Sequence, residues 1–218
     1  MPDPIDTYRQ LRLERCRRAL VKNKFEVFMA SDVQDAGTLF RERILAPLEV
    51  NVASWGDSMT LQATGVLDTI RVDPGIRMIE TFDTTISQEE RLERRRQALL
   101  SDLFLSGSNA VTETGLLVNL DMVGNRVAGI TFGPKTVVLF IGRNKIVPTL
   151  DDAMARVRNI AAPANAIRHP GLKTPCTKTA LCTDCSSPDR ICNTWCITEK
   201  SFPAGRIKII LINQDLGL

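Results

Sequence analysis

The chain has 218 residues, of which 44% are hydrophobic and 24% are charged, which suits one sizeable α/β domain or two small ones. This composition excludes wholesale disorder, collagen and coiled coil. A net charge of +3 and an aromatic content of 5% argue against a nucleic-acid partner. No apolar run approaches a membrane span, and the acidic N-terminal residues lack the apolar core of a signal peptide. We therefore expect a cytoplasmic protein with neither a membrane nor a nucleic-acid partner.

Helices and strands alternate in the first half of the chain. In the first helix Cys16 shares an apolar face with Leu13 and Leu20, which predicts a buried small side chain rather than a metal ligand. Ser31 is in position to cap the second helix. The expected elements are a helix over 5–22, a strand over 25–30, a helix from 33 to Pro47, a strand over 50–55 and a helix through Leu61 and Val66.

The second half continues the alternation and then changes character. Residues 73–86 look irregular, and Ser87 begins a helix. Residues 171–205 carry little apolar periodicity, so a metal would help to order them. The remaining expected elements are strands over 102–105, 116–120, 135–141 and 206–212, and a helix from 149 that Ala162 and Pro163 close. The pattern predicts an α/β fold: an open, mostly parallel sheet flanked by helices, with an irregular Cys-rich loop before the last strand.

Cysteine clustering gives the clearest chemical signal. The chain has one histidine, His169, so a His-rich metal site cannot be built, whereas five of the six cysteines fall between residues 176 and 196. Thiolates suit zinc and iron–sulfur clusters. Disulfides or thiols without a ligand are the alternatives, and a reducing cytosol disfavours the disulfides. We expect a four-cysteine site made of Cys176, Cys182, Cys185 and Cys192, with Cys196 either spare or a substitute for one of them.

A glycine- and hydroxyl-rich loop follows the second strand. Residues Gly56, Ser58 and Thr60 lie between that strand and a helix, where backbone N–H groups and hydroxyls suit a phosphate or carboxylate. An ordinary strand-to-helix turn, with Ser58 as the helix cap, explains the same residues without a ligand.

Polar side chains recur at strand ends in the middle of the chain, where an open parallel sheet forms its ligand crevice. Glu113 could act as a nucleophile or general base, and Arg126 and Lys145 could hold an anion. Ordinary turn chemistry is the competing explanation. The further candidates for ligand binding in this stretch are Asn109, Thr114, Gly115, Asn119, Asp121, Asn125 and Asn144.

These motifs resemble the LUD (lactate-utilization) domain family over nearly the whole chain after residue 20. The resemblance is most specific within residues 100–192. It rests on the segments NAVTETG at 109–115, LVNLD at 117–121, GNRV at 124–127, FGPK at 132–135, GRNKIV at 142–147, AAPANAIR at 161–168, TPC at 174–176, CTDC at 182–185, SPDRIC at 187–192 and DLGL at 215–218.

The resemblance implies a fold like that of the sugar-phosphate isomerases and CoA transferases, and a context of bacterial lactate oxidation beside iron–sulfur oxidoreductase subunits. In that superfamily the loop matching Gly56, Ser58 and Thr60 binds phosphate. Asp57 departs from the small residue expected there, and its carboxylate would repel a phosphate. Glu113 precedes Thr114 and Gly115 as the glutamate of CoA transferases precedes a glycine. The four chosen cysteines are shared with one branch of single-domain LUD proteins; Cys196 is not.

Three functions are therefore compatible with the sequence. The first is an accessory or electron-transfer protein of lactate or organic-acid oxidation, with an iron–sulfur cluster or zinc on the cysteines and a small anion in the crevice. The second is a CoA-transferase- or isomerase-like enzyme that uses Glu113, with structural zinc. A regulatory scaffold with a structural metal is a third.

We expect one domain over residues 1–218 that includes the metal-binding loop 171–205. The expected partners are an organic acid, phosphate or CoA ester, iron–sulfur oxidoreductase subunits, and a second copy in a homodimer.

Overall fold

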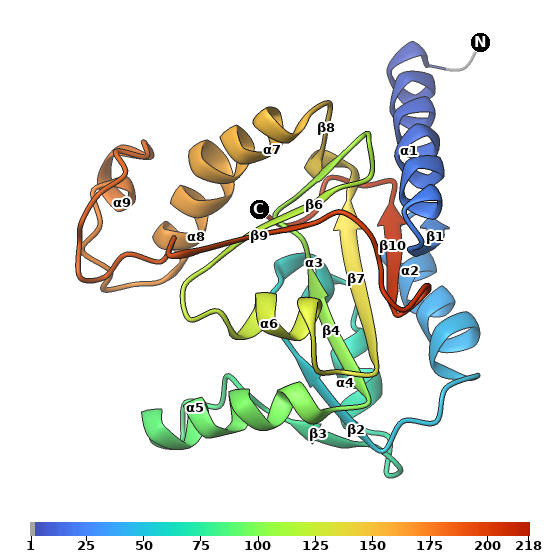
Figure 1. Cartoon of the computed structure of the whole chain (residues 1–218), viewed down its shortest axis with the longest axis horizontal. Coiled ribbons are helices and arrows are strands. Elements are labelled where there is room, and N and C mark those ends of the chain that lie inside the picture. The colour runs from blue at the N-terminus through green and yellow to red at the C-terminus, as the bar shows by residue number, and fades with distance from the viewer. Residues whose placement is uncertain (1–2) are drawn as a thin grey trace.

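A computed structural model describes residues 3–218 and shows an α/β architecture built on a six-stranded parallel sheet (Figure 1). Every neighbouring pair in this main sheet is parallel. This arrangement confirms the predicted fold class. In order across the sheet the strands are β1 (Glu26–Ala30), β10 (Ile207–Ile212), β7 (Thr136–Gly142), β4 (Leu103–Gly107), β2 (Val52–Trp55) and β3 (Arg77–Ile79).

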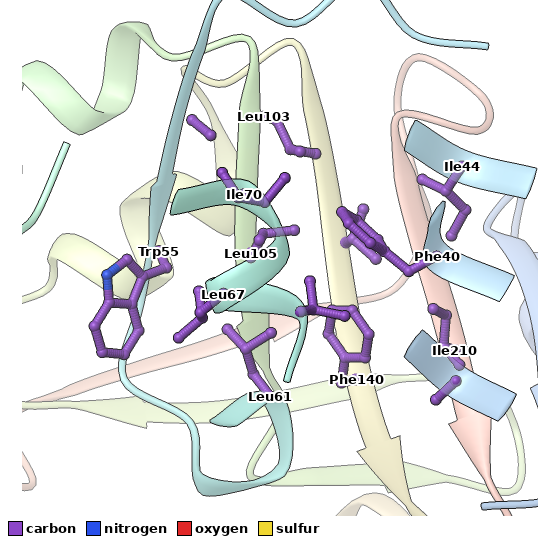
Figure 2. Close-up of a cluster of buried hydrophobic side chains, with 14 of the residues drawn as sticks. Phe40, Ile44, Trp55, Leu61, Leu67, Ile70, Leu103, Leu105, Phe140 and Ile210 are labelled. Atoms are coloured by element: carbon purple, nitrogen blue, oxygen red, sulfur yellow. The ribbon is translucent and has the colours of Figure 1, made fainter. Parts of the chain in front are cut away.

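Both faces of the main sheet are buried, as the continuous apolar run of β7 predicts. Val138 and Phe140 of β7 point to one face, where they join Phe40 and Leu61 in the cluster that Figure 2 shows. Alternate residues of β7 point to the opposite face, toward helix α1 (Pro4–Lys22) and its buried Cys16. The helices over the first face are α2 (Val33–Leu39), the π-helical η1 (Phe40–Leu45), α3 (Met59–Ala63) and α4 (Val66–Arg71).

A second sheet of four strands covers part of the α1 side of the main sheet. Its members are β8 (Ile146–Val147), β5 (Ala110–Thr112), β6 (Leu117–Asp121) and β9 (Thr194–Thr198). The strand predicted over 116–120 therefore exists but lies outside the main sheet, and β6 pairs antiparallel with both β5 and β9. Helix α7 (Leu150–Arg156) and the π-helical η4 (Val157–Ala161) contribute Ala153 and Val157 to a third cluster that packs against this sheet.

Several predicted element boundaries are wrong, each for a local reason. Asp32, not Ser31, caps α2, because its carboxylate accepts a hydrogen bond from the Asp35 amide. The helix predicted through Leu61 and Val66 is split into α3 and α4 at Gly65, whose φ is +67°. Residues 73–86 contain the short edge strand β3. Pro163 does not end its helix: the wide π turn of η4 accommodates it, and α8 (Ala162–Arg168) continues.

The remaining elements are short and surround the two sheets. Helices α7 and α8 and the Cys-rich segment around α9 (Cys176–Thr179) extend to the left of the main sheet in Figure 1, opposite α1. Between residues 3 and 218 no helix is both long and apolar enough to cross a membrane. The other elements are α5 (Gln88–Gln97), the 3-10 turns η2 (Ala98–Leu100) and η3 (Arg143–Lys145), and α6 (Asn125–Thr131).

Candidate functional site

A cavity of about 350 Å³ lies beyond the carboxyl ends of the parallel strands. Asp57 and Ser58 follow β2, Ser108 and Asn109 follow β4, and Lys145 lies in the turn after β7. This is the place where an open parallel sheet forms a ligand crevice. Six of the predicted ligand-binding residues line the cavity, namely Ser58, Asn109, Asp121, Asn125, Arg126 and Lys145.

Two of these six residues are engaged in capping helices. The Ser58 hydroxyl accepts a hydrogen bond from the Leu61 amide at 3.2 Å and so caps α3. One carboxylate oxygen of Asp121 accepts from the amides of Arg126 and Val127 at the start of α6. The alternative explanation of Ser58 as a turn residue therefore accounts for its position, and α3 is too short to offer an anion site by its own dipole.

Arg126 joins the main sheet to the second sheet. Its guanidinium donates to Asn119 Oδ1 and Asn109 Oδ1, both at 2.8 Å, and to the carbonyls of Gly107 and Leu120. Burial lowers the pKa of Arg126, and the nearby carboxylates of Asp121 and Asp57 act in the opposite direction. Because its Nη groups are occupied by protein oxygens, Arg126 positions the cavity wall instead of offering Nη donors to a ligand.

Two glycines allow this close packing. A Cβ on Gly56 would lie 2.7 Å from Cγ of Arg126, and a Cβ on Gly107 would lie 2.4 Å from Oγ of Ser58. Gly56 itself does not line the cavity. The structure gives Gly56 a steric role, because the missing side chain makes room for Arg126, and its role in ligand binding stays a prediction.

The segment after β10 closes the side of the cavity near Lys145. Thr60 donates to the Leu216 carbonyl at 3.1 Å, and Asn144 Oδ1 accepts from the Leu216 amide at 3.0 Å. Neither Thr60 nor Asn144 lines the cavity; both hold residues 213–218 against it. A Cβ on Gly217 would lie 3.3 Å from the Lys145 Nζ, so the backbone of this segment passes directly over the amine.

Lys145 is a buried amine that faces the cavity. Its side chain is 4% exposed, and within residues 3–218 it has neither an ion pair nor a side-chain hydrogen bond. Burial, helped by the positive charges of Arg156 and Arg126, lowers the pKa of Lys145 to about 7. An amine in this state is partly neutral near physiological pH.

Sequence reasoning missed two arginines of the cavity wall. Arg95 of α5 lies in the Arg-rich run 91–96, for which the sequence favours a solvated helix face over an anion site. Its Nε is buried without a hydrogen-bond partner in the described part of the chain, and its guanidinium lies 5.6 Å from the ring centre of Phe82. Arg168 of α8 pairs with Asp57 and donates to Asn165. The run 91–96 and the segment 161–168 were the available signals for these two residues.

Glu113 and its neighbours lie outside the cavity. The carboxylate of Glu113 accepts from Arg12 at 2.7 Å and from Arg15 at 2.8 Å, both on α1. Burial alone would raise the pKa of Glu113, but these two hydrogen bonds outweigh it and lower the pKa. The carbonyls of Thr114 and Gly115 accept from Asn23 at the end of α1. This turn therefore anchors α1, and the catalytic role of Glu113 stays a prediction without support from the cavity.

The four chosen cysteines line one small pocket beside α8. Arg190 ties this loop together by donating to the carbonyls of Cys185 at 2.6 Å and Cys192 at 2.9 Å. Burial raises the pKa of Cys192; Arg190 opposes this, and the neighbouring thiols raise the pKa further. Within residues 3–218, however, no three His, Cys, Asp or Glu side chains converge on one point as a metal ion requires.

Cys196 and Cys16 lie apart from that pocket. Cys196 belongs to β9, where its thiol lies 3.3 Å from the Thr131 hydroxyl. Cys16 is fully buried, which confirms its prediction as a small core residue, and burial raises its pKa to about 12. Both cysteines therefore lie outside the pocket that the four chosen cysteines line.

Comparison with known proteins places this chain in a family. The LUD domain model matches residues 13–212. Comparison with curated proteins gives no match. Among solved structures, a DUF162 family protein from Deinococcus radiodurans is similar with a TM-score of 0.49 and 13% identity, over 94% of this chain and 98% of that one. Since this match covers most of the chain, the chain belongs to the LUD domain family, and this membership supports a role related to lactate utilization.

Proposed function

We propose that this protein binds a small organic acid such as lactate or pyruvate in its cavity, and that it serves organic-acid oxidation as an accessory or electron-transfer component. The carboxylate would lie among the cationic side chains of the cavity. A volume of about 350 Å³ leaves ample room for a three-carbon acid.

The observation that carries this proposal is the state of the cavity's charged side chains. Arg126 and Arg168 are occupied by protein oxygens, and Asp57 is paired with Arg168. Lys145 and Arg95 are left with donors that no protein group in residues 3–218 uses. Two such cations on the wall of one cavity favour an anionic ligand, since a buried polar group without a partner is costly.

A binding measurement tests the anion site. Isothermal titration calorimetry would compare D-lactate, L-lactate, pyruvate and inorganic phosphate on the full chain. We expect a carboxylate to bind, and Lys145→Met and Arg95→Met each to weaken it by roughly tenfold or more, since a hydrogen bond to a charged group contributes about 1.5–3 kcal/mol.

Arg96→Met is the matched control, because Arg96 is on the same helix, is 65% exposed and pairs with Glu93. It should leave the affinity unchanged. Equal weakening by Arg95→Met and Arg96→Met would count against a specific site. Tight binding of phosphate alone would favour the isomerase-like alternative.

The proposal includes a metal on Cys176, Cys182, Cys185 and Cys192. What supports it is that four thiols share one pocket within a loop of little apolar content. An iron–sulfur cluster would supply one-electron transfer, and zinc would order the loop. If the metal is an iron–sulfur cluster, we expect the protein to exchange electrons with an iron–sulfur oxidoreductase partner. The homodimer is a separate prediction.

Metal analysis with a visible spectrum of protein purified without oxygen tests this second part. We expect iron with acid-labile sulfide, or one zinc per chain. Cys182→Ser should lose the metal, and Cys196→Ser should keep it, because Cys196 lies on β9 outside the pocket. Protein that is free of both metals, or metal loss in both variants alike, would contradict the assigned ligands.

A further inference from the structure

Lys145 lies between two strands at the wall of the cavity. It lies in the turn η3, one residue before β8 and directly after the central strand β7, so its backbone is fixed from both sides. Its side chain is buried, yet it lines the cavity. A lysine whose only role was to neutralise charge would normally be paired, whereas in the described part of the chain no carboxylate oxygen lies within 4.0 Å of this amine.

The surroundings of the amine keep a lone pair available. Arg156 of α7 is held beside it by the carbonyls of Asn144 and Asn109, at 3.1 Å and 2.6 Å from its donors. Arg126 of α6 lies on the cavity wall as well. The resulting pKa of about 7 means that a large share of the Lys145 side chains is neutral near pH 7, unlike an exposed lysine. Nucleophilic lysines of enzymes are activated by this combination of burial and neighbouring cations.

From this geometry we propose that the Lys145 amine condenses with the carbonyl carbon of a small 2-oxo acid held in the cavity, forming an imine. The Lys145 nitrogen forms a double bond to that carbon, the carbon–oxygen double bond breaks, and the oxygen leaves as water with the two protons of the amine. The step needs no oxidant or reductant. The choice of a 2-oxo acid rests on the proposed function, since it is the oxidised form of a 2-hydroxy acid.

Trapping with sodium borohydride tests this inference. The full chain would be incubated with pyruvate, reduced, and analysed by intact mass and by peptide mapping. We expect one adduct per chain on Lys145, with the added mass of pyruvic acid less one oxygen atom. Lactate has a hydroxyl in place of the carbonyl, so it should give no adduct and should protect Lys145 when it is added first.

Two variants sharpen the result. Lys145→Met should lose the adduct, whereas Lys135→Met should keep it, because Lys135 is exposed, is paired with Asp102 and has a raised pKa. The peptide map of the unmodified sequence locates the adduct even if Lys145→Met fails to fold. Labelling spread over exposed lysines would overturn the inference.

Calorimetry distinguishes failure of the imine from failure of the proposed function. Pyruvate that binds but yields no adduct on Lys145 overturns the imine and leaves the proposed function standing. If neither pyruvate nor lactate binds, both the imine and the proposed function are overturned.

Discussion

Arg168 of α8 and Asp57 at the end of β2 form an ion pair on the cavity wall although 111 residues separate them in the chain. The pair answers the difficulty that Asp57 raises for an anion site, because the carboxylate is neutralised by its own partner. Asn165 Oδ1 accepts from the same guanidinium at 2.8 Å and fixes its orientation.

Replacing Arg168 should therefore weaken anion binding indirectly. In Arg168→Met the Asp57 carboxylate faces the cavity without its arginine partner and repels the ligand, so we expect the pyruvate dissociation constant to rise by roughly tenfold. Calorimetry measures it. The double variant Asp57→Asn with Arg168→Met should recover most of the affinity; failure to recover would mean that Arg168 itself contacts the ligand.

Arg126 should contribute to stability. Arg126→Met would remove the guanidinium that donates to the carbonyls of Gly107 and Leu120 and to the side-chain oxygens of Asn109 and Asn119, so we expect a loss of about 3 kcal/mol or more in the free energy of unfolding. Urea unfolding followed by circular dichroism measures it. Arg96→Met should stay within about 0.5 kcal/mol as a surface control. An unchanged midpoint in Arg126→Met would refute the structural role.

The pH dependence of stability should report on Lys145. Its folded pKa of about 7 lies below the ordinary lysine value of 10.5, so between these values the unfolded chain binds more protons than the folded one. Lys145 therefore destabilises the fold most below pH 7, and its cost falls as pH rises toward 10.5, by at most about 1.4 kcal/mol per pH unit.

The difference in unfolding free energy between the unmodified protein and Lys145→Met, measured in urea from pH 6.5 to 9.5, should thus change in favour of the unmodified protein as pH rises. A flat difference would mean that Lys145 keeps an ordinary pKa in the fold.

Glu113 offers a test of the enzyme alternative. Glu113→Gln keeps the shape of the side chain but weakens the contacts with Arg12 and Arg15, so we expect a loss of about 1–2 kcal/mol in stability and no change in ligand affinity. Thermal unfolding and calorimetry measure the two. Unchanged stability together with lost transferase or isomerase activity would support the catalytic prediction instead.

The sequence by itself determined every strand of the main sheet except the edge strand β3, because uninterrupted apolar runs such as 137–141 are typical of strands buried on both faces. It also located the crevice, since the carboxyl ends of parallel strands meet at one edge and Asn109, Arg126 and Lys145 follow such strands or lie beside them. The cluster of cysteines was equally visible in the chain, as was the burial of Cys16.

Tertiary structure decided which polar residues face a ligand and which face the protein. Glu113 turns toward α1 and Asn119 toward Arg126, whereas Arg95 and Arg168 reach the cavity from helices distant in sequence. The second sheet also required the fold, because β9 pairs with β6 across more than 70 intervening positions, such as Asp121 with Thr194. The physical reason is that hydrophobic periodicity indicates only whether a side chain is buried. The partner of a buried charge is set by packing between distant segments, and local sequence carries no record of that packing.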